Sequence, residues 1–246
     1  MSNPSNTNSA PARRDDFTAT HWTQIAQAAE QDGSTAARRA LEALCVRYWP
    51  AIYSFLRRKN HGTEDAEDLT QGFFAHLLED NALARADRSK GRFRNFLLGA
   101  LQRFLVDEAR RSGAQKRGRD RTVLALDFAA VEQCYLDESD PGLSPEQLFD
   151  RRWAATVLEA AFTDLHEEFR EADQSARFDA LKKYLSEEVS DGDYAGLSAR
   201  LGLAPKAVSS AVSRLRDRYR ELVRRNVLAT VAGAEEVDAE FRELFR

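Results

Sequence analysis

Apolar residues recur at helical spacing along most of the chain, while the alternating pattern of a half-buried strand is nearly absent. Helical spacing is found near residues 22–31, 35–59, 64–79, 91–111, 145–170, 174–186, 193–201, 205–225 and 234–244. Only residues 121–128 (RTVLALDF) resemble a short strand, and they lie among loop signals. The sequence therefore predicts an all-α protein.

A break in this pattern divides the chain, because residues 112–144 are rich in Gly, Pro, Ser and charge. We expect a disordered polar tail (1–16), a helical domain (17–111), a flexible linker (112–144), a second small helical domain (145–225) and an extension helix (226–246). The second domain has a clear start signal. Ser144 is a candidate N-cap, Pro145 occupies the first turn and Gln147 stands at the capping-box position.

Several classes of protein are disfavoured by what the sequence lacks. No apolar run approaches the roughly 20 residues that span a bilayer, and the N-terminus has no apolar core of a secretory signal. Cys45 and Cys134 stand alone, and the four histidines are scattered, so neither a metal site nor a disulfide framework is expected. No clustered catalytic set is found. We expect a cytoplasmic protein that is not an enzyme and needs no cofactor.

Charge is distributed unevenly, although the net charge is only −4. Residues 85–121 carry a net charge of +8 and residues 200–225 a net charge of +6, whereas residues 132–191 between them carry −10. Two basic blocks that flank an acidic one are consistent with two surfaces that face a polyanion. Uneven charge also occurs on ordinary solvated surfaces, so this pattern does not decide the function alone.

The most basic stretch has the pattern of a helix-turn-helix, with a short helix that stops at Gly202 and a longer one that restarts at Pro205. Apolar residues Val208, Val212, Leu215, Tyr219 and Leu222 form a single stripe on the second helix. The other side carries the candidate DNA-binding residues Lys206, Ser209, Ser210, Ser213, Arg214, Arg216 and Arg218. Small residues let a helix approach base edges, and arginines hold phosphates or guanines. An ordinary helical hairpin with a solvated basic face is the alternative.

Two further helices carry one-sided charge. In residues 63–80, Asp65, Asp68 and Gln71 lie outside an apolar stripe, in a segment without Lys or Arg from Glu64 to Asp80. Acids in a first turn favour the helix dipole, and they also offer a negative surface to a basic partner. A metal or acid–base role for Asp65 and Asp68 lacks further ligands nearby. Residues 90–119 form a basic amphipathic helix and tail, typical of either phosphate contact or plain solvation.

These three stretches, in this order, resemble bacterial RNA polymerase sigma factors of the extracytoplasmic-function type. Residues 65–74 (DAEDLTQGFF) are similar to the family's D-A-E-D-L-x-Q-x-x-F helix, which docks on the largest polymerase subunit. Residues 93–111 (FRNFLLGALQRFLVDEARR) resemble the helix that contacts melted promoter DNA. Residues 194–216 (YAGLSARLGLAPKAVSSAVSRLR) resemble the helix-turn-helix that reads the upstream promoter element. Ala207 and Ala211 replace a Thr and an Arg of the family pattern, which implies a different promoter sequence.

The resemblance implies a role for each candidate residue. Asp65, Asp68 and Gln71 would bind core polymerase. The residues that would contact the melted downstream element are Arg88, Lys90, Arg92, Arg94, Asn95, Gln102, Arg103, Arg110 and Arg111. The residues on the basic side of the second helix of the helix-turn-helix would contact the double-stranded upstream element.

We therefore interpret the chain as a sigma factor that brings core polymerase to promoters, monomeric when free, without membrane contact, and with an anti-sigma factor or another regulator as a candidate partner. The alternative is a helix-turn-helix transcription regulator that is not a polymerase subunit. The sequence assigns no role to the two ends of the chain or to the long linker.

Overall fold

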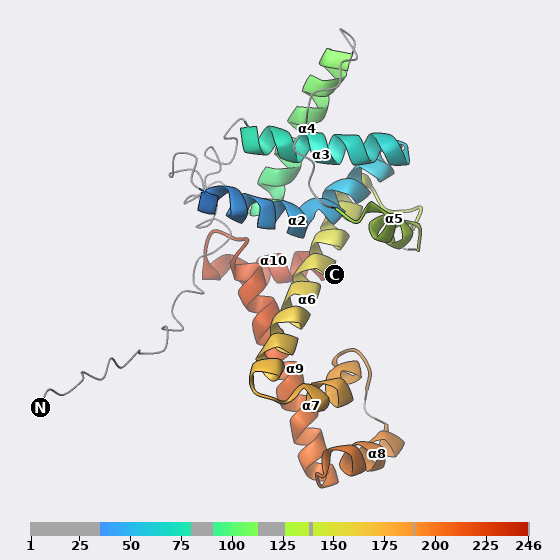
Figure 1. Ribbon diagram of the computed structural model, residues 1–246, viewed down its shortest axis with the longest axis vertical. Helices are drawn as coiled ribbons and strands as arrows, with labels where there is room; N and C mark the ends of the chain where they lie inside the picture. Colours follow the sequence, from blue (N-terminus) through green and yellow to red (C-terminus); the bar gives the residue numbers. More distant parts are fainter. Residues whose placement is uncertain (1–34, 80–90, 113–125, 138–139, 189, 246) are drawn as a thin grey trace, which may run out of the picture.

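The computed structural model describes residues 35–79, 91–112, 126–137, 140–188 and 190–245. These residues form helices and contain no strand, which confirms the all-α prediction (Figure 1). The elements are α2 (Thr35–Arg58), α3 (Thr63–Glu79), α4 (Phe93–Ser112), α5 (Phe128–Asp137), α6 (Pro145–Glu171), α7 (Ser175–Leu181), the 3-10 helix η4 (Lys182–Leu185), α8 (Asp191–Leu201), α9 (Pro205–Leu228), the 3-10 helix η5 (Ala234–Glu236) and α10 (Val237–Leu244). The expected tail 1–16, the expected helix near 22–31 and the strand-like residues 121–125 lie outside the described residues.

Helix α6 is the spine of the molecule. It packs on α2 near its start and runs beside α9 along the long axis, so that α2 and α3 lie at one end and α8 at the other (Figure 1). Its start agrees with the sequence signal. The Gln147 N–H donates to Ser144 Oγ (3.2 Å), and the Ser144 N–H donates to Gln147 Oε1 (2.8 Å), with Pro145 in the first turn. This capping box fixes where the long helix begins.

Aromatic side chains join the start of α6 to the helices at the N-terminal end. The Trp153 ring stacks on Tyr48 of α2, with ring centres 3.9 Å apart, and the Phe93 ring of α4 lies 6.0 Å from Trp153. All three side chains are almost fully buried, and burying a large apolar side chain contributes about 1.5–3 kcal/mol. One buried cluster continues from Cys45 to Leu244. The expected boundary at residues 144–145 therefore does not separate two cores, because the first turns of α6 complete the core of α2 and α4.

A helix occupies part of the segment that was expected to be a flexible linker. Phe128, at the start of α5, packs against Trp49 and Tyr53 with ring centres 4.9 and 5.5 Å away. One turn later, Glu132 accepts hydrogen bonds from the Tyr53 hydroxyl (2.7 Å) and from Arg57 Nε and Nη2 (2.9 and 2.7 Å). The described part of the linker is thus fastened to α2. The Gly- and Pro-rich sequence on either side of α5 predicted a loop, so this ten-residue helix was not predicted. One aromatic ring, Phe128, and one carboxylate, Glu132, hold it on α2.

The turn between α8 and α9 follows the sequence prediction. Gly202 ends α8 in the left-handed region (φ 64°), where a residue without a Cβ is favoured, and Pro205 is the first residue of α9. Helix α8 begins at Asp191, two residues before the predicted start at residue 193, and its N-cap is Ser190. The Asp193 carboxylate accepts hydrogen bonds from the Ser190 hydroxyl (2.6 Å) and N–H (3.1 Å), which hold the pKa of Asp193 well below its usual range.

Candidate nucleic-acid interface

The first half of α9 presents the polar face that the sequence analysis assigned to DNA. Its apolar stripe is buried at Val208, Val212 and Leu215, so the opposite side of the helix faces outward. The exposed residues on that side are Lys206, Ser209, Ser210, Ser213 and Arg214. Among the described residues none forms an ion pair with Arg214, whose guanidinium is therefore available to a phosphate or a base edge. We call these five residues the α9 face.

Arg216 and Arg218 do not belong to the α9 face, although the helical spacing placed them there. Arg216 is half-buried, and it donates from Nε to the Tyr184 carbonyl (2.7 Å) and from Nη2 to the Glu187 carbonyl (2.6 Å). It thus satisfies carbonyl groups in and just after η4. Arg218 donates from Nε and Nη2 to both oxygens of Glu168 on α6 (2.9 and 2.6 Å). Hydrogen bonds that Arg218 donates to Glu168 and Glu221 raise the pKa of Arg218 above its ordinary value. Arg216 therefore links α9 to η4 and the residues that follow it, and Arg218 links α9 to α6.

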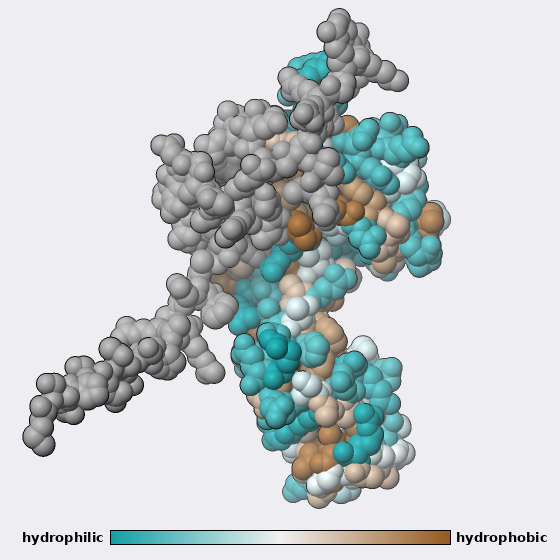
Figure 2. Space-filling view, viewed as in Figure 1, coloured by the Kyte–Doolittle hydropathy of each residue, from teal (hydrophilic) through white to brown (hydrophobic). Residues whose placement is uncertain are grey.

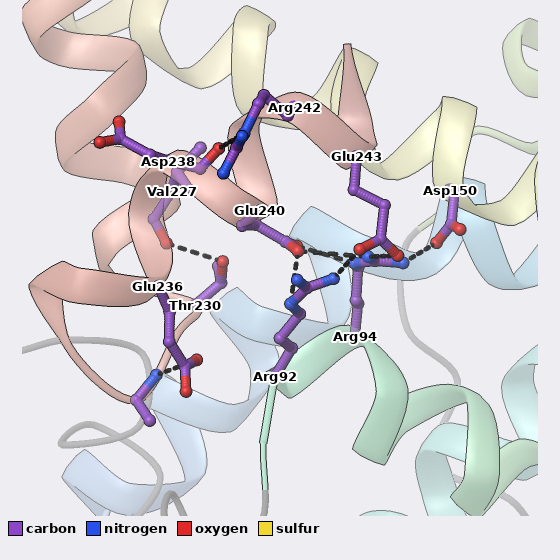
Figure 3. A network of polar contacts seen from close by, with 11 residues as sticks. Arg92, Arg94, Asp150, Val227, Thr230, Glu236, Asp238, Glu240, Arg242 and Glu243 are labelled. Carbon is purple, nitrogen blue, oxygen red and sulfur yellow. Dashed lines mark hydrogen bonds and ion pairs between the residues drawn. The ribbon is translucent and has the colours of Figure 1, made fainter. Parts of the chain in front are cut away.

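At the start of α4, Arg92 and Arg94 point toward carboxylates of α6 and α10 rather than outward (Figure 3). Arg94 Nε donates to Glu240 Oε1 (2.7 Å) and Arg94 Nη2 to Glu243 Oε1 (2.6 Å), while Arg94 Nη1 donates to Asp150. Arg92 Nε lies 2.9 Å from Glu240 Oε2, and its Nη1 contacts Glu243. We call Arg92, Arg94, Asp150, Glu240 and Glu243 the clasp.

The clasp is buried at its centre and open at its rim. The side chain of Arg94 is 3% exposed and that of Glu240 0%, whereas Glu243 is 48% exposed. Burial by itself would lower the pKa of Arg94, but hydrogen bonds to Glu240 and Glu243 outweigh it and hold the pKa above the ordinary value. Hydrogen bonds from Arg92 and Arg94 in turn lower the pKa of Glu243. Burial raises the pKa of Asp150, against the pull of Arg94. Arg94 therefore stays charged inside the protein.

The remainder of α4 has an exposed polar side. Asn95, Gln102, Arg103, Arg110 and Arg111 are all exposed, as a nucleic-acid surface requires. Arg110 lies 3.8 Å from Asp107 and Arg111 lies 3.4 Å from Glu108, in pairs three residues apart on one helix. Such exposed pairs contribute little, so these arginines can exchange their partners for phosphates. Arg88 and Lys90 lie outside the described residues.

Helix α3 has the predicted amphipathic arrangement. Ala66, Phe73 and Leu77 are buried, while Asp65 and Asp68 are exposed and Gln71 is half-buried. The N-terminal end of α3 presents a hydrophilic surface (Figure 2). This end of the molecule therefore offers acidic groups to a partner. Among the described residues, no group of three or more His, Cys, Asp and Glu side chains is placed to hold a metal ion.

The spacing of charged residues along the chain did not predict the C-terminal partners of Arg92 and Arg94. The extension had no assigned role, yet α10 supplies both Glu240 and Glu243 to the clasp. One signal was available in the sequence, because glutamates three residues apart lie on the same side of a helix. Nothing in the spacing identified α4 as the helix that they face.

Comparison with known proteins identifies one part of the chain. Residues 44–115 match the family model Sigma-70 region 2. The match spans α2 from its middle onward, together with α3 and α4, and so includes both the acidic helix and the basic helix described above. The match supports a relation of this part of the chain to sigma factors. No curated protein and no solved structure matches the chain. None of the described helices is long and apolar enough to cross a membrane.

Proposed function

We propose that the protein is a sigma factor of the extracytoplasmic-function type, which binds core RNA polymerase through α3 and reads the upstream promoter element through α8 and α9. The observation that carries the proposal is the region 2 match over α2–α4, combined with a free basic α9 face at the opposite end of the molecule. A polymerase subunit that selects promoters needs both surfaces. The polymerase supplies the chemistry, and this chain supplies the contacts.

Each surface has its own role in this proposal. Asp65 and Asp68 on α3 meet a basic surface of the polymerase, with Gln71 at the edge of the contact. The exposed residues of α4, from Asn95 to Arg111, follow the backbone of the melted strand. The α9 face enters the major groove of the upstream element, where Lys206 and Arg214 supply positive charge and the serines supply short hydrogen-bonding groups.

A pull-down with purified core RNA polymerase tests the proposal directly. We expect the wild-type protein to be retained and the Asp65→Arg variant to be lost, because reversal of an exposed acid places like charges at the contact. Glu159→Arg is the matched control, since Glu159 is exposed on α6, away from α3. Its capture should equal that of the wild type.

Two results would argue against the proposal. Failure of the folded wild-type protein to bind polymerase would leave an independent helix-turn-helix regulator as the better interpretation. Equal loss in Asp65→Arg and Glu159→Arg would show that total charge, rather than the α3 surface, determines capture.

A further inference from the structure

The clasp brings α10 onto Arg92 and Arg94, two arginines that the sequence resemblance assigns to melted DNA. Arg94 is the central residue, because its Nε, Nη1 and Nη2 atoms all donate to carboxylates from two other helices. A guanidinium has five N–H donors in a fixed fork. That fork is directed at Glu240, Glu243 and Asp150 (Figure 3). Because the Arg94 side chain is only 3% exposed, a phosphate oxygen has no approach to it in this arrangement.

Helix α10 is also held by contacts that do not involve the clasp. Val237 and Leu244 are buried in the common core, and Arg224 of α9 pairs with Asp238 at 2.6 Å. The Phe93 N–H at the start of α4 donates to the Thr230 carbonyl (2.9 Å), in the segment that leads into α10. The extension is therefore a docked element: α10 packs on α9 and α6, and it contacts the start of α4 through the clasp.

Electrostatics makes α10 a competitor of nucleic acid at this site. Three carboxylates surround two guanidinium groups, so the clasp carries no excess positive charge for a polyanion. Carboxylates and phosphates bind guanidinium in the same two-pronged geometry, so one can replace the other. The desolvation of a buried ion pair offsets much of its attraction, so exchanging a carboxylate for a phosphate does not forfeit a large stabilisation.

We propose that α10 closes the start of α4 in the free protein, competing with single-stranded nucleic acid for Arg92 and Arg94. The proposal rests on the role of α4 in the proposed function. Opening begins at the rim, where Glu243 and Arg92 are partly exposed, and it reaches Arg94 only when α10 leaves the buried centre. The C-terminal extension is thus an autoinhibitory element of the α4 surface.

Binding of a labelled oligothymidylate, measured by fluorescence anisotropy at several salt concentrations, tests the proposal on the full chain. The double variant Glu240→Gln, Glu243→Gln removes two carboxylates of the clasp. We expect about tenfold tighter binding at low salt, and a steeper dependence of affinity on salt. Each phosphate contact on a single strand contributes about 0.7 to that slope, so two released arginines add about 1.4.

The matched control is the double variant Glu171→Gln, Glu235→Gln. It changes the net charge by the same amount, at exposed residues of α6 and η5 outside the clasp. We expect its salt slope to stay at the wild-type value. Equal slopes in the two double variants would overturn the proposal, because net charge alone would then explain the gain. An unchanged slope in the clasp variant would overturn it as well.

A milder variant and a second measurement apply if the double variant does not fold. Glu243→Gln changes only the half-exposed member of the clasp, and its slope should rise by about 0.7. In the wild type, saturating oligothymidylate should accelerate hydrogen exchange of the α10 amides. Bound DNA with α10 still protected would overturn the proposal.

These measurements contain no polymerase, so their outcome is separate from that of the pull-down. Polymerase capture with unchanged slopes would overturn the clasp proposal and leave the sigma factor assignment standing. Steeper slopes without capture would support competition by α10 and overturn the assignment.

Discussion

The Arg94 guanidinium donates to the Glu240 carboxylate at 2.7 Å, although 146 positions separate the two residues in the chain. Both side chains are almost fully buried, so the contact is part of the interior rather than a surface pair. It connects the start of α4, inside the region 2 match, to the last helix of the chain. The C-terminal extension therefore folds as one unit with α4 and α6.

The first prediction concerns the loss of stability when the ion pair between Arg94 and Glu240 is broken. Arg94→Met leaves Glu240 buried without its main partner, and breaking one side of a buried ion pair costs about 3–5 kcal/mol. We expect the free energy of unfolding, measured with urea, to fall by that amount. Arg103→Met is the control on the same helix. Arg103 is exposed, so its loss should change the free energy by no more than about 0.5 kcal/mol.

A double-mutant cycle separates the pair from the packing around it. Arg94→Met leaves the Glu240 carboxylate buried without its main partner, and adding Glu240→Leu removes that charge. The double variant should therefore be more stable than the sum of the two single losses indicates. Strict additivity would mean that the two residues do not interact in solution.

The second prediction tests whether α2–α4 and α8–α9 unfold together. Trp153 is fully buried on α6 and stacks on Tyr48, and truncating such a ring costs about 3–5 kcal/mol. Because one core runs through the molecule, Trp153→Ala should lower the stability of α9 amides as well as α3 amides in hydrogen exchange. Trp153→Phe, which keeps an aromatic ring, should have a smaller effect. Loss of protection confined to α2–α4 would show that the two halves unfold independently.

Local features of this fold could be predicted from the sequence because each depends on neighbours in the chain. The α9 stripe through Val208 and Val212 follows from helical spacing, and the turn at Gly202 from the one residue type that favours a left-handed backbone. The capping box of Ser144 and Gln147 is likewise a four-residue pattern. Such signals remain valid whatever the rest of the chain does.

Long-range partners could not be predicted in the same way. Spacing placed Arg216 on the outward side of α9, but its long side chain reaches back to the Tyr184 carbonyl. Arg94 has the spacing of an exposed residue in a basic helix, yet it is buried, because three carboxylates from α6 and α10 surround it. A sequence pattern reports which side of a helix is polar, and only the packing decides which of those polar groups meet a partner.

The third prediction separates a DNA contact from a structural arginine two positions away. Arg214→Ala should weaken binding to promoter DNA and reduce its salt slope by about 0.9, with unfolding changed by no more than about 0.5 kcal/mol. Arg216→Ala should do the reverse. It removes charged hydrogen bonds to two carbonyls, so we expect a loss of about 1.5–3 kcal/mol in stability and a nearly unchanged slope. Urea unfolding and fluorescence anisotropy, measured on both variants, provide the comparison. A reduced slope in Arg216→Ala alone would reverse the two assignments.

The fourth prediction concerns the pH dependence of the contact between α5 and α2. Hydrogen bonds from Arg57, and then from Tyr53, lower the pKa of Glu132 against the opposing effect of burial. A carboxyl whose pKa is lower in the folded state stabilises the protein above its unfolded pKa, about 4.3 for Glu, and that contribution is lost as the pH falls through the folded pKa. The stability difference between the wild type and Glu132→Gln should therefore be largest near neutral pH and shrink in acid. Urea unfolding of both proteins across this pH range measures the difference in their free energies of unfolding. All other carboxylates are the same in the two proteins, so the pH dependence of the difference reports on Glu132. A difference that stays constant, or grows in acid, would show that the Glu132 charge does not fasten α5 to α2.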